Sequence, residues 1–306
     1  MNYTEKRIGM QNTEEEPLAE LVNEVSSSGV DTRALEKRPC LLDGSAGTAL
    51  WAMAEAAGVE RKSVWMYNIE HPEFVLELHR RYVEAGCRMI QANTFSINRQ
   101  SVARESAYSV EEVVTAAVRL AKQATEGTGV QVYATFGPLL QLMEPYGRLS
   151  EAEVYDIYSE LAETALREGA DLIVLETFMD IRMMEVAARA AKRFGKPVIC
   201  SMTFERRHRT MMGDTVKKIV ETLEPLGIDG VGMNCSAGPV EALGIIKEFS
   251  QLTKLPLYFK PNAGMGENYS AKQFAQEIDP ALPLVSFVGG CCGCDEEYIK
   301  EIRKLL

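Results

Sequence analysis

Eight short apolar runs alternate with helical patterns along most of this 306-residue chain, and this alternation limits the fold more than any other feature. Each run has the length and the residue types of a buried β-strand. The predicted strands are Cys40–Asp43, Arg88–Ala92, Val130–Thr135, Leu172–Leu175, Pro197–Thr203, Gly230–Met233, Leu257–Phe259 and Leu284–Val288. The predicted helices between them include Pro72–Ala85, Ser150–Glu168, Arg182–Phe194, Asp214–Leu226 and Pro239–Leu252.

Repeated βα units of this kind predict a parallel sheet with right-handed crossovers, the mark of an α/β protein. Eight units in about 270 residues fit a single (β/α)8 TIM barrel, and a doubly wound open sheet is the alternative. No low-complexity linker or change of composition divides the chain after residue 38. We therefore expect an N-terminal extension over residues 1–38 and one barrel over residues 39–306.

Charge and composition exclude several classes of partner. The formal net charge of −11 argues against a nucleic acid or an anionic membrane surface, because both need a basic face. No apolar stretch approaches the length of about 18 residues that a membrane helix needs, and the acidic N-terminus has no apolar signal core. The seven cysteines are an odd number without a secretory signal, which indicates reduced thiols in a cytoplasmic protein.

Polar side chains stand at the ends of six of the predicted strands. In barrels of this kind the active site lies at the C-terminal ends of the strands, so these side chains are expected to converge on one mouth. They are Asp43, Asn93, Glu176, Cys235, Asn262, Cys291 and Cys292. With only three histidines in the chain, we do not expect a histidine-centred mechanism.

Three of these residues are cysteines. Cys235 follows the sixth predicted strand, and Cys291 and Cys292 follow the eighth. Two adjacent cysteines can bind one ion only where the backbone turns sharply, and glycines at positions 289, 290 and 293 supply that freedom. A catalytic zinc site has three protein ligands, with Zn–S bonds of about 2.3 Å, and one open position. The sequence therefore predicts a three-thiolate zinc site.

The other cysteines and a redox function supply the alternatives. Cys40, Cys87 and Cys200 lie in or beside apolar segments and are predicted to be buried hydrophobic side chains. A redox switch within the glycine-flanked cysteine group is the competing hypothesis for the cluster. Cys294, the last cysteine of that group, is predicted to be a neighbour of the site and not a ligand.

The charge of such a site favours one kind of chemistry. Zinc with three thiolates carries a net charge of −1, which makes it a weak electrophile and a poor generator of hydroxide. A thiol that takes the fourth position is deprotonated on coordination, whereas a free thiol with a pKa near 8.5 is mostly protonated at neutral pH. The site is therefore suited to alkylation of a thiol more than to hydrolysis.

Six motifs in register closely resemble the zinc-dependent homocysteine S-methyltransferase family, which includes the homocysteine-binding domain of cobalamin-dependent methionine synthase and betaine–homocysteine methyltransferase. The similarity covers roughly residues 38–306. The motifs are Asp43-Gly44-Ser45-Ala46-Gly47-Thr48, Ala92-Asn93-Thr94-Phe95, Leu175-Glu176-Thr177, Gly232-Met233-Asn234-Cys235, Pro261-Asn262-Ala263-Gly264 and Gly289-Gly290-Cys291-Cys292-Gly293. The resemblance implies a barrel in which Cys235, Cys291 and Cys292 bind zinc, and in which zinc activates the homocysteine thiolate for attack on a methyl group.

The resemblance also suggests how the amino-acid end of homocysteine is bound. Asp43 and Glu176 are expected to pair with its ammonium, although Glu176 has the alternative of a helix-capping or solvated carboxylate. The segment Gly44–Thr48 is expected to open a helix, and its free N–H groups, with Gly44 and Ala46 as the candidate residues, suit the carboxylate; an ordinary glycine-rich turn is the alternative.

Two asparagines complete the predicted site. Asn93 and Asn262 are expected either to hydrogen-bond the substrate or to serve as turn residues, and Asn262 has the further option of filling the open zinc position before the thiol arrives.

The methyl donor is the least constrained part of the prediction. The motifs after the second and seventh strands are closer to the synthase branch, which favours a methylated corrinoid protein. Because 306 residues leave no room for the other domains of the synthase, we expect this donor in trans. S-methylmethionine or betaine as donor, and a non-catalytic zinc or redox thiol module, are the alternatives.

Overall fold

The computed structural model describes residues 38–205, 207–263 and 269–306. The residues from Arg38 to Leu306 form one compact unit. The predicted extension over residues 1–38 lies, apart from Arg38, outside the described residues, so the predicted domain boundary stays a prediction.

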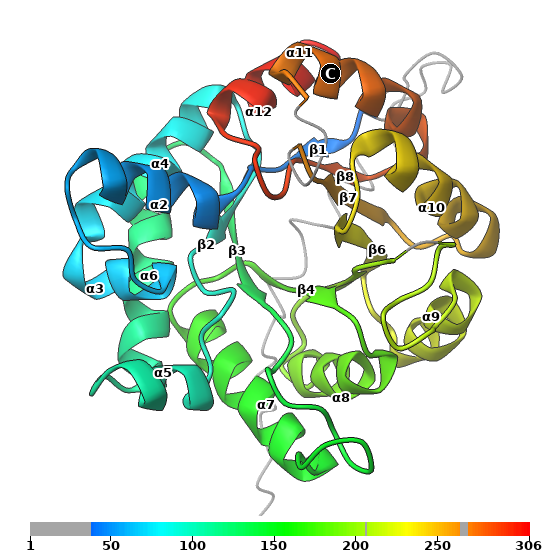
Figure 1. Cartoon of the computed structure of the whole chain (residues 1–306), viewed down its shortest axis with the longest axis horizontal. Coiled ribbons are helices and arrows are strands. Elements are labelled where there is room, and N and C mark those ends of the chain that lie inside the picture. The colour runs from blue at the N-terminus through cyan, green and yellow to red at the C-terminus, as the bar shows by residue number, and fades with distance from the viewer. Residues whose placement is uncertain (1–37, 206, 264–268) are drawn as a thin grey trace, which may run out of the picture. The chain divides into compact units, whose positions relative to one another are not determined.

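Eight parallel strands form the barrel that the sequence predicts (Figure 1). They pair in the order β1-β8-β7-β6-β5-β4-β3-β2, and a backbone hydrogen bond of 2.8 Å from the amide of Arg88 to the carbonyl of Leu41 joins the two end strands. This closure excludes the open doubly wound sheet. The strands are β1 (Cys40–Leu41), β2 (Met89–Ala92), β3 (Gln131–Phe136), β4 (Leu172–Phe178), β5 (Val198–Met202), β6 (Gly230–Cys235), β7 (Leu257–Pro261) and β8 (Phe287–Val288).

Helices surround the barrel, and side-chain caps fix where several of them begin. The Ser150 and Ser109 hydroxyls each accept a hydrogen bond from the amide three residues ahead, and the Glu153 and Glu112 carboxylates accept one from the amide of the capping serine, so both helices open with a capping box. The helices are α2 (Ala46–Ala56), α3 (Tyr67–Glu70), α4 (Pro72–Ala85), α5 (Arg99–Glu105), α6 (Val110–Thr125), α7 (Glu151–Arg167), α8 (Ile181–Lys192), α9 (Val216–Leu223), α10 (Pro239–Leu252), α11 (Ala271–Ile278) and α12 (Glu296–Arg303).

Three short 3-10 helices complete the described elements, and the last of them includes Leu284, where the predicted eighth strand was expected to begin. They are η1 (Val64–Met66), η2 (Glu224–Leu226) and η3 (Asp279–Leu284). The prolines of η3 fix φ near the helical value and remove amide donors, so the chain reaches the sheet only after Leu284. In contrast, β7 extends beyond its predicted end at Phe259 and includes Lys260.

The barrel interior has an apolar layer and a polar layer. Side chains that alternate along the strands, among them Met89, Tyr133, Val174, Ile199 and Tyr258, pack together inside the sheet, apart from the larger core between sheet and helices. Two residues further along the same strands, on the same face, stand polar side chains. These are Gln91, Thr135, Glu176, Ser201 and Lys260, and all are buried.

The helices that the structure describes include none that is both long and apolar enough to cross a lipid bilayer. All seven cysteines are free thiols, and Cys40, Cys87 and Cys200 are buried as predicted.

Candidate metal and substrate site

The end of β6 presents Cys235 from an unusual backbone conformation. Cys235 and Ser236 have φ angles of 58° and 66°, in the left-handed region that residues other than glycine rarely adopt. The Ser236 hydroxyl holds this turn, because it lies 2.6 Å from the Thr203 hydroxyl and accepts a hydrogen bond of 2.6 Å from the amide of Phe204. The turn leaves Cys235 Sγ beside a thiol of the loop that follows β8.

That loop passes close to its neighbours at two glycines. A Cβ atom at Gly289 would lie 2.6 Å from the carbonyl oxygen of Asp43, and one at Gly290 would lie 2.5 Å from Cys294 Sγ. Gly293 has a φ of 83°, which closes the turn. The glycines therefore serve the close packing and the sharp turn that two adjacent ligands require.

The backbone amides of the two adjacent cysteines are anchored on the end of β7. The Cys291 amide donates to the carbonyl of Pro261 at 2.9 Å, and the Cys292 amide donates to Asn262 Oδ1 at 3.1 Å. Both side chains are half-buried at the mouth of the barrel. The end of β7 thus fixes the position of the cysteine pair that follows β8.

The three thiols form a compact cluster. The sulfur atoms of Cys235, Cys291 and Cys292 all lie within 4.8 Å of one another, and Cys235 Sγ is 3.6 Å from Cys292 Sγ. Two sulfurs bound tetrahedrally to zinc at 2.3 Å are separated by roughly 3.8 Å. Among the residues that the structure describes, this is the one group of three or more such side chains close enough to share an ion. The donor set and its spacing fit zinc.

The proximity of the thiols makes them difficult to ionise together. The hydrogen bond with Cys291 lowers the pKa of Cys235, but the hydrogen bond with Cys292, burial and charge repulsion outweigh it and raise the pKa to about 11. For Cys292 the hydrogen bond with Cys235 lowers the pKa, and the hydrogen bond with Cys291 and burial raise it to about 11. The hydrogen bond with Cys235 and burial likewise raise the pKa of Cys291. A bound cation removes this penalty and releases the protons.

Cys294 lies outside the cluster. Its side chain is 1% exposed and its Sγ is 4.0 Å from the carbonyl oxygen of Pro261. Its own carbonyl accepts hydrogen bonds from the amide of Ser45 at 2.8 Å and from the Tyr82 hydroxyl at 3.3 Å. Cys294 therefore ties the end of β1 to the loop after β8.

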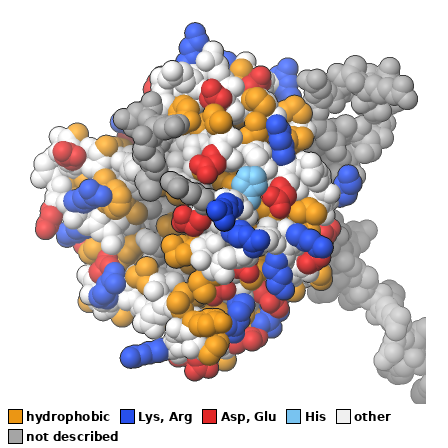
Figure 2. All heavy atoms as spheres, turned by 45° about the vertical axis from the view of Figure 1, so that its right-hand side comes forward, with side chains coloured by type: hydrophobic (Ala, Val, Ile, Leu, Met, Phe, Trp, Pro, Cys, Tyr) orange, Lys and Arg blue, Asp and Glu red, His pale blue; other side chains and the backbone are white. Residues whose placement is uncertain are grey.

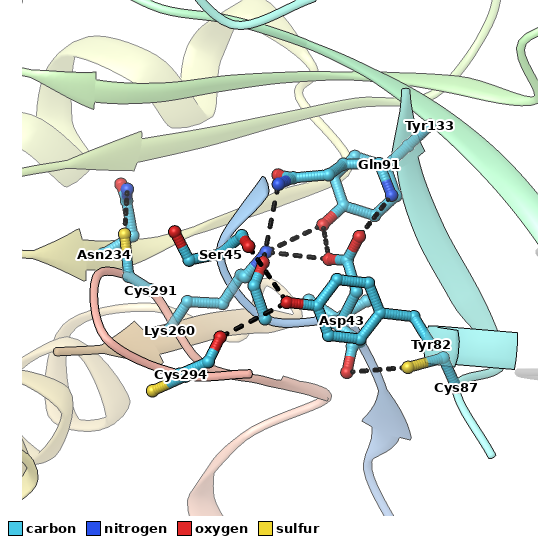
Figure 3. A network of polar contacts seen from close by, with 12 residues as sticks. Asp43, Ser45, Tyr82, Cys87, Gln91, Tyr133, Asn234, Lys260, Cys291 and Cys294 are labelled. Carbon is cyan, nitrogen blue, oxygen red and sulfur yellow. Dashed lines mark hydrogen bonds and ion pairs between the residues drawn. The ribbon is translucent and has the colours of Figure 1, made fainter. Parts of the chain in front are cut away.

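Asp43 is buried in a network of its own (Figure 3). Its Oδ2 accepts a hydrogen bond of 2.7 Å from the amide of Gln91. Its Oδ1 lies 2.8 Å from the Tyr133 hydroxyl and 2.9 Å from Lys260 Nζ. The Lys260 ammonium also donates to the Tyr133 hydroxyl at 3.0 Å. The negative charge of Asp43 is thus balanced within the protein.

Lys260 is 2% exposed and spans the barrel from β7 to β1. Burial alone would lower the pKa of its ammonium, but the charges of Asp43, Glu176 and Cys291 outweigh burial and hold the pKa above its ordinary value. Lys260 therefore stays charged beneath the mouth. Our sequence prediction missed it, although a lysine within an apolar strand directly before Pro261 was a visible signal.

Glu176 has a less complete set of partners. Its Oε2 accepts a hydrogen bond of 3.1 Å from the Tyr258 hydroxyl, and the side chain is 6% exposed. Burial raises the pKa of this carboxyl group, and the charge of Lys260 lowers it by less. A hydrogen bond with the Thr135 side chain also lowers this pKa. Unlike Asp43, Glu176 forms no salt bridge with any residue that the structure describes, so its carboxylate can pair with a cationic group of a ligand.

The two predicted asparagines differ in how completely their side-chain amides are hydrogen-bonded. Both amide hydrogens of Asn93 are engaged, since its Nδ2 donates at 2.9 Å to the carbonyl of Val64 and at 2.9 Å to Asn68 Oδ1. Asn262 uses its Oδ1 to hold Cys292, while its buried Nδ2 has no partner. An unpartnered buried donor beside the thiol cluster indicates a place for a ligand.

Helix α2 begins at Ala46, within the segment 44–48 that was predicted to open a helix. Ser45 caps it by accepting a hydrogen bond of 3.2 Å from the amide of Thr48. Gly44 allows close packing, because a Cβ atom there would lie 2.3 Å from the carbonyl oxygen of Cys294. The first helical amides, including that of Ala46, have no intrahelical acceptor and can bind a carboxylate.

Comparison with known proteins places these features in one family. Residues 40–306 match the family model described as homocysteine S-methyltransferase. Two curated relatives are named methionine synthase. The protein from Mycobacterium tuberculosis is 28% identical over 88% of this chain and 24% of its own length, and the one from Mycobacterium leprae is 28% identical over 89% and 25%. The chain spans about a quarter of the length of these relatives.

Among solved structures, the metallated form of the homocysteine methyltransferase MmuM from Escherichia coli superposes with a TM-score of 0.74. The alignment covers 89% of this chain and 97% of MmuM at 20% identity. This similarity confirms the TIM-barrel fold.

Proposed function

The chain belongs to the homocysteine S-methyltransferase family, as its motifs predicted, and on this premise we propose that it transfers a methyl group to the thiolate of homocysteine to give methionine. In this reaction a carbon–sulfur bond forms to the methyl group, and the bond from that group to its donor breaks with the electron pair left on the donor. The observation that carries the proposal is the cluster of Cys235, Cys291 and Cys292, which matches a three-ligand site with an open fourth position.

We propose that zinc is the metal of this cluster. A metallated form of the E. coli protein supports metal binding in this fold, and the spacing of the three sulfur atoms supports the cluster as its place here. Zinc bound there would keep the acceptor sulfur in its thiolate form. We propose that Asn262, whose buried Nδ2 has no partner, hydrogen-bonds the acceptor or fills the open zinc position until the acceptor thiol arrives.

The amino-acid end of homocysteine is assigned to the carboxylates of Glu176 and Asp43 and to the start of helix α2. Glu176 offers its carboxylate to the ammonium, and Asp43 contributes from within its network. The amides at Gly44 and Ala46 are assigned to the carboxylate, and Asn93, whose donors are engaged, offers only its side-chain oxygen. The contribution of Asp43 is expected to be the smaller of the two carboxylates, because Lys260 already balances its charge.

We propose a methylated corrinoid protein as the donor, and the surface supports a large partner. Large hydrophobic side chains stand exposed on segments that follow strands β2, β3, β5 and β6. They are Phe95, Leu140, Leu142, Tyr146, Met211, Met212 and Val240. Figure 2 shows hydrophobic side chains lying between charged groups on one face of the molecule. A small sulfonium or betaine donor does not require such a surface.

The free thiols suit a reducing compartment, and we propose the cytoplasm.

A methionine-formation assay across donors tests this proposal. The zinc-loaded protein is incubated with homocysteine and, separately, a methylcobamide protein, methylcobalamin, methyltetrahydrofolate, S-methylmethionine and glycine betaine. We expect the highest rate with the methylcobamide protein. Activity only with the sulfonium or the betaine rejects the corrinoid donor, and the absence of methionine with every donor favours the non-catalytic zinc or redox module.

A further inference from the structure

The side-chain amide of Asn234 lies at the centre of four contacts beneath the cysteine cluster. Its Oδ1 accepts hydrogen bonds from the amide of Thr177 at 2.8 Å and from the Ser201 hydroxyl at 2.7 Å. Its Nδ2 donates to Thr177 Oγ1 at 2.7 Å and approaches Cys291 Sγ at 3.9 Å. Asn234 itself is fully buried. Because Oδ1 receives a backbone N–H, the orientation of the amide is fixed by its partners.

These contacts join the ends of four strands. Asn234 directly precedes Cys235 at the end of β6, Thr177 belongs to β4, Ser201 belongs to β5, and Cys291 follows β8. Figure 3 shows the Asn234 side chain directed at the Cys291 sulfur. The Asn234 side chain thus contacts both strand β4, which carries Glu176, and one thiol of the cysteine cluster.

The backbone is strained at Thr177, which Asn234 contacts, and at Cys235, which follows Asn234 in the chain. Thr177 has a φ of 65°, which is uncommon for a β-branched residue, and Cys235 has a φ of 58°. The register between β4 and β5 shifts between Leu175 and Phe178, around Thr177. Such conformations persist only where the surroundings hold them. The two hydrogen bonds between Asn234 and Thr177 supply that restraint on β4.

Glu176 lies next to the restrained residue. The backbone conformation of Thr177 determines how the preceding side chain is presented, and Glu176 is the buried strand-end carboxylate that has no salt bridge among the described residues. We propose that Asn234 is a positioning residue that holds Glu176 and the cysteine cluster at a fixed separation, so that one amino-acid thiol is bound by its sulfur and its ammonium together. This inference rests on the proposed function of the site.

The alternative is a buried asparagine that only stabilises the barrel. Binding measurements on protein loaded with Co²⁺ in place of zinc separate the two, because sulfur coordination to Co²⁺ is seen in the absorption spectrum and needs no methyl donor. The ligands are homocysteine and 4-sulfanylbutanoate, which is homocysteine without its amino group. The ratio of their dissociation constants measures how well Glu176 is positioned.

We expect Asn234→Ala to reduce the preference for homocysteine about tenfold, because Glu176 moves away from the ammonium. We also expect it to weaken Co²⁺ binding about 10- to 100-fold, as loss of an outer contact to a metal ligand does. Thr177→Val removes only the acceptor of the Nδ2 hydrogen bond. We expect it also to lower the preference for homocysteine and the affinity for Co²⁺. This second variant serves if Asn234→Ala does not fold.

Ser201→Ala is the matched control. It removes a buried hydrogen bond to the same Oδ1 but touches neither Glu176 nor a thiol, so we expect a lower melting temperature with an unchanged preference. If Asn234→Ala and Thr177→Val also keep the wild-type preference, the positioning role is wrong. If homocysteine adds no sulfur band to wild-type protein, the proposed function fails instead, and the two failures are therefore distinguishable.

Discussion

The cysteine cluster and the Asp43 network are two buried polar regions that differ in charge balance. Asp43 has its own counter-ion in Lys260, at 2.9 Å, and its remaining contacts come from Gln91 and Tyr133. The three thiols have no cationic partner in contact among the described residues, and the hydrogen bonds among them, burial and mutual repulsion together raise their pKa values. The first region is complete within the protein, and the second needs a cation.

The difference shows which buried groups are available for function. A buried ion pair satisfies its own charges, whereas a group without a counter-ion is stabilised by binding one. Glu176 lies between these cases, since the Tyr258 and Thr135 side chains hydrogen-bond to it but no described residue forms a salt bridge with it. The comparison predicts that removing a thiol weakens metal binding and that removing Lys260 lowers the free energy of unfolding. It also predicts that removing the Glu176 charge weakens binding of the acceptor.

The largest expected effect follows from Cys292→Ser. We expect zinc to fall from about one ion per chain to almost none, and methyl transfer to fall by more than the roughly 100-fold cost of losing an outer-shell partner. The stability of the zinc-free protein should change little, because the cluster does not stabilise that state. Metal analysis after gel filtration, together with the methionine assay, measures both quantities.

Cys294→Ser is the control for this change, because Cys294 is buried in the same loop but outside the cluster. It should retain zinc. Full zinc content in Cys292→Ser would contradict the assignment of the ligands.

Lys260→Met is expected to have a smaller effect, and the effect is on the free energy of unfolding. The substitution leaves Asp43 as an uncompensated buried charge, which lowers the free energy of unfolding by about 3–5 kcal/mol. Chemical denaturation of the zinc-free protein measures this loss. The double variant Asp43→Asn/Lys260→Met removes both charges and should recover most of the stability. If Lys260→Met is as stable as the wild type, Asp43 is not balanced by this pair.

The smallest effect is expected from Glu176→Gln. Because a hydrogen bond to a charged group contributes about 1.5–3 kcal/mol, the KM for homocysteine should rise about 10- to 100-fold, with less change in kcat. Asp43→Asn should raise the KM less. Steady-state kinetics of the two variants test this order directly, and the reverse order would identify Asp43 as the main partner of the ammonium.

Glu176→Gln also has a pH signature. Burial raises the pKa of Glu176 above its unfolded value, so folding favours the protonated carboxyl group. The resulting stabilisation is complete below the ordinary glutamate pKa and is lost as the pH rises through the raised value. Relative to Glu176→Gln, which does not titrate, the wild type should therefore lose stability with rising pH. Melting temperatures measured from pH 4 to 8 show the sign.

The barrel was predictable because its signals are local. Strand and helix periods, and the order of the motifs, can be recognised in the sequence without knowledge of contacts. The same holds for Cys235, Cys291 and Cys292, because the ends of parallel strands meet at one mouth. The shortened β8 was missed because an apolar run does not distinguish a strand from the 3-10 turn imposed by prolines.

Charge balance in the site was not predictable in this way. Asp43 and Glu176 are both acidic residues at strand ends, and only the structure shows that Lys260, 217 residues from Asp43, balances the first. The predicted seventh strand ends before Lys260, so the strand pattern does not predict that the Lys260 side chain points into the barrel. The role of Asn234 depends on the left-handed backbone of Thr177, for which the sequence carries no clear signal.

The central claim, that the cluster binds zinc and leaves a position for the acceptor sulfur, is tested most directly by X-ray absorption at the zinc edge. The spectrum of the zinc-loaded protein is recorded with and without homocysteine. The account predicts about three sulfur ligands without homocysteine and about four with it. An unchanged number of sulfur ligands on addition of homocysteine would contradict it.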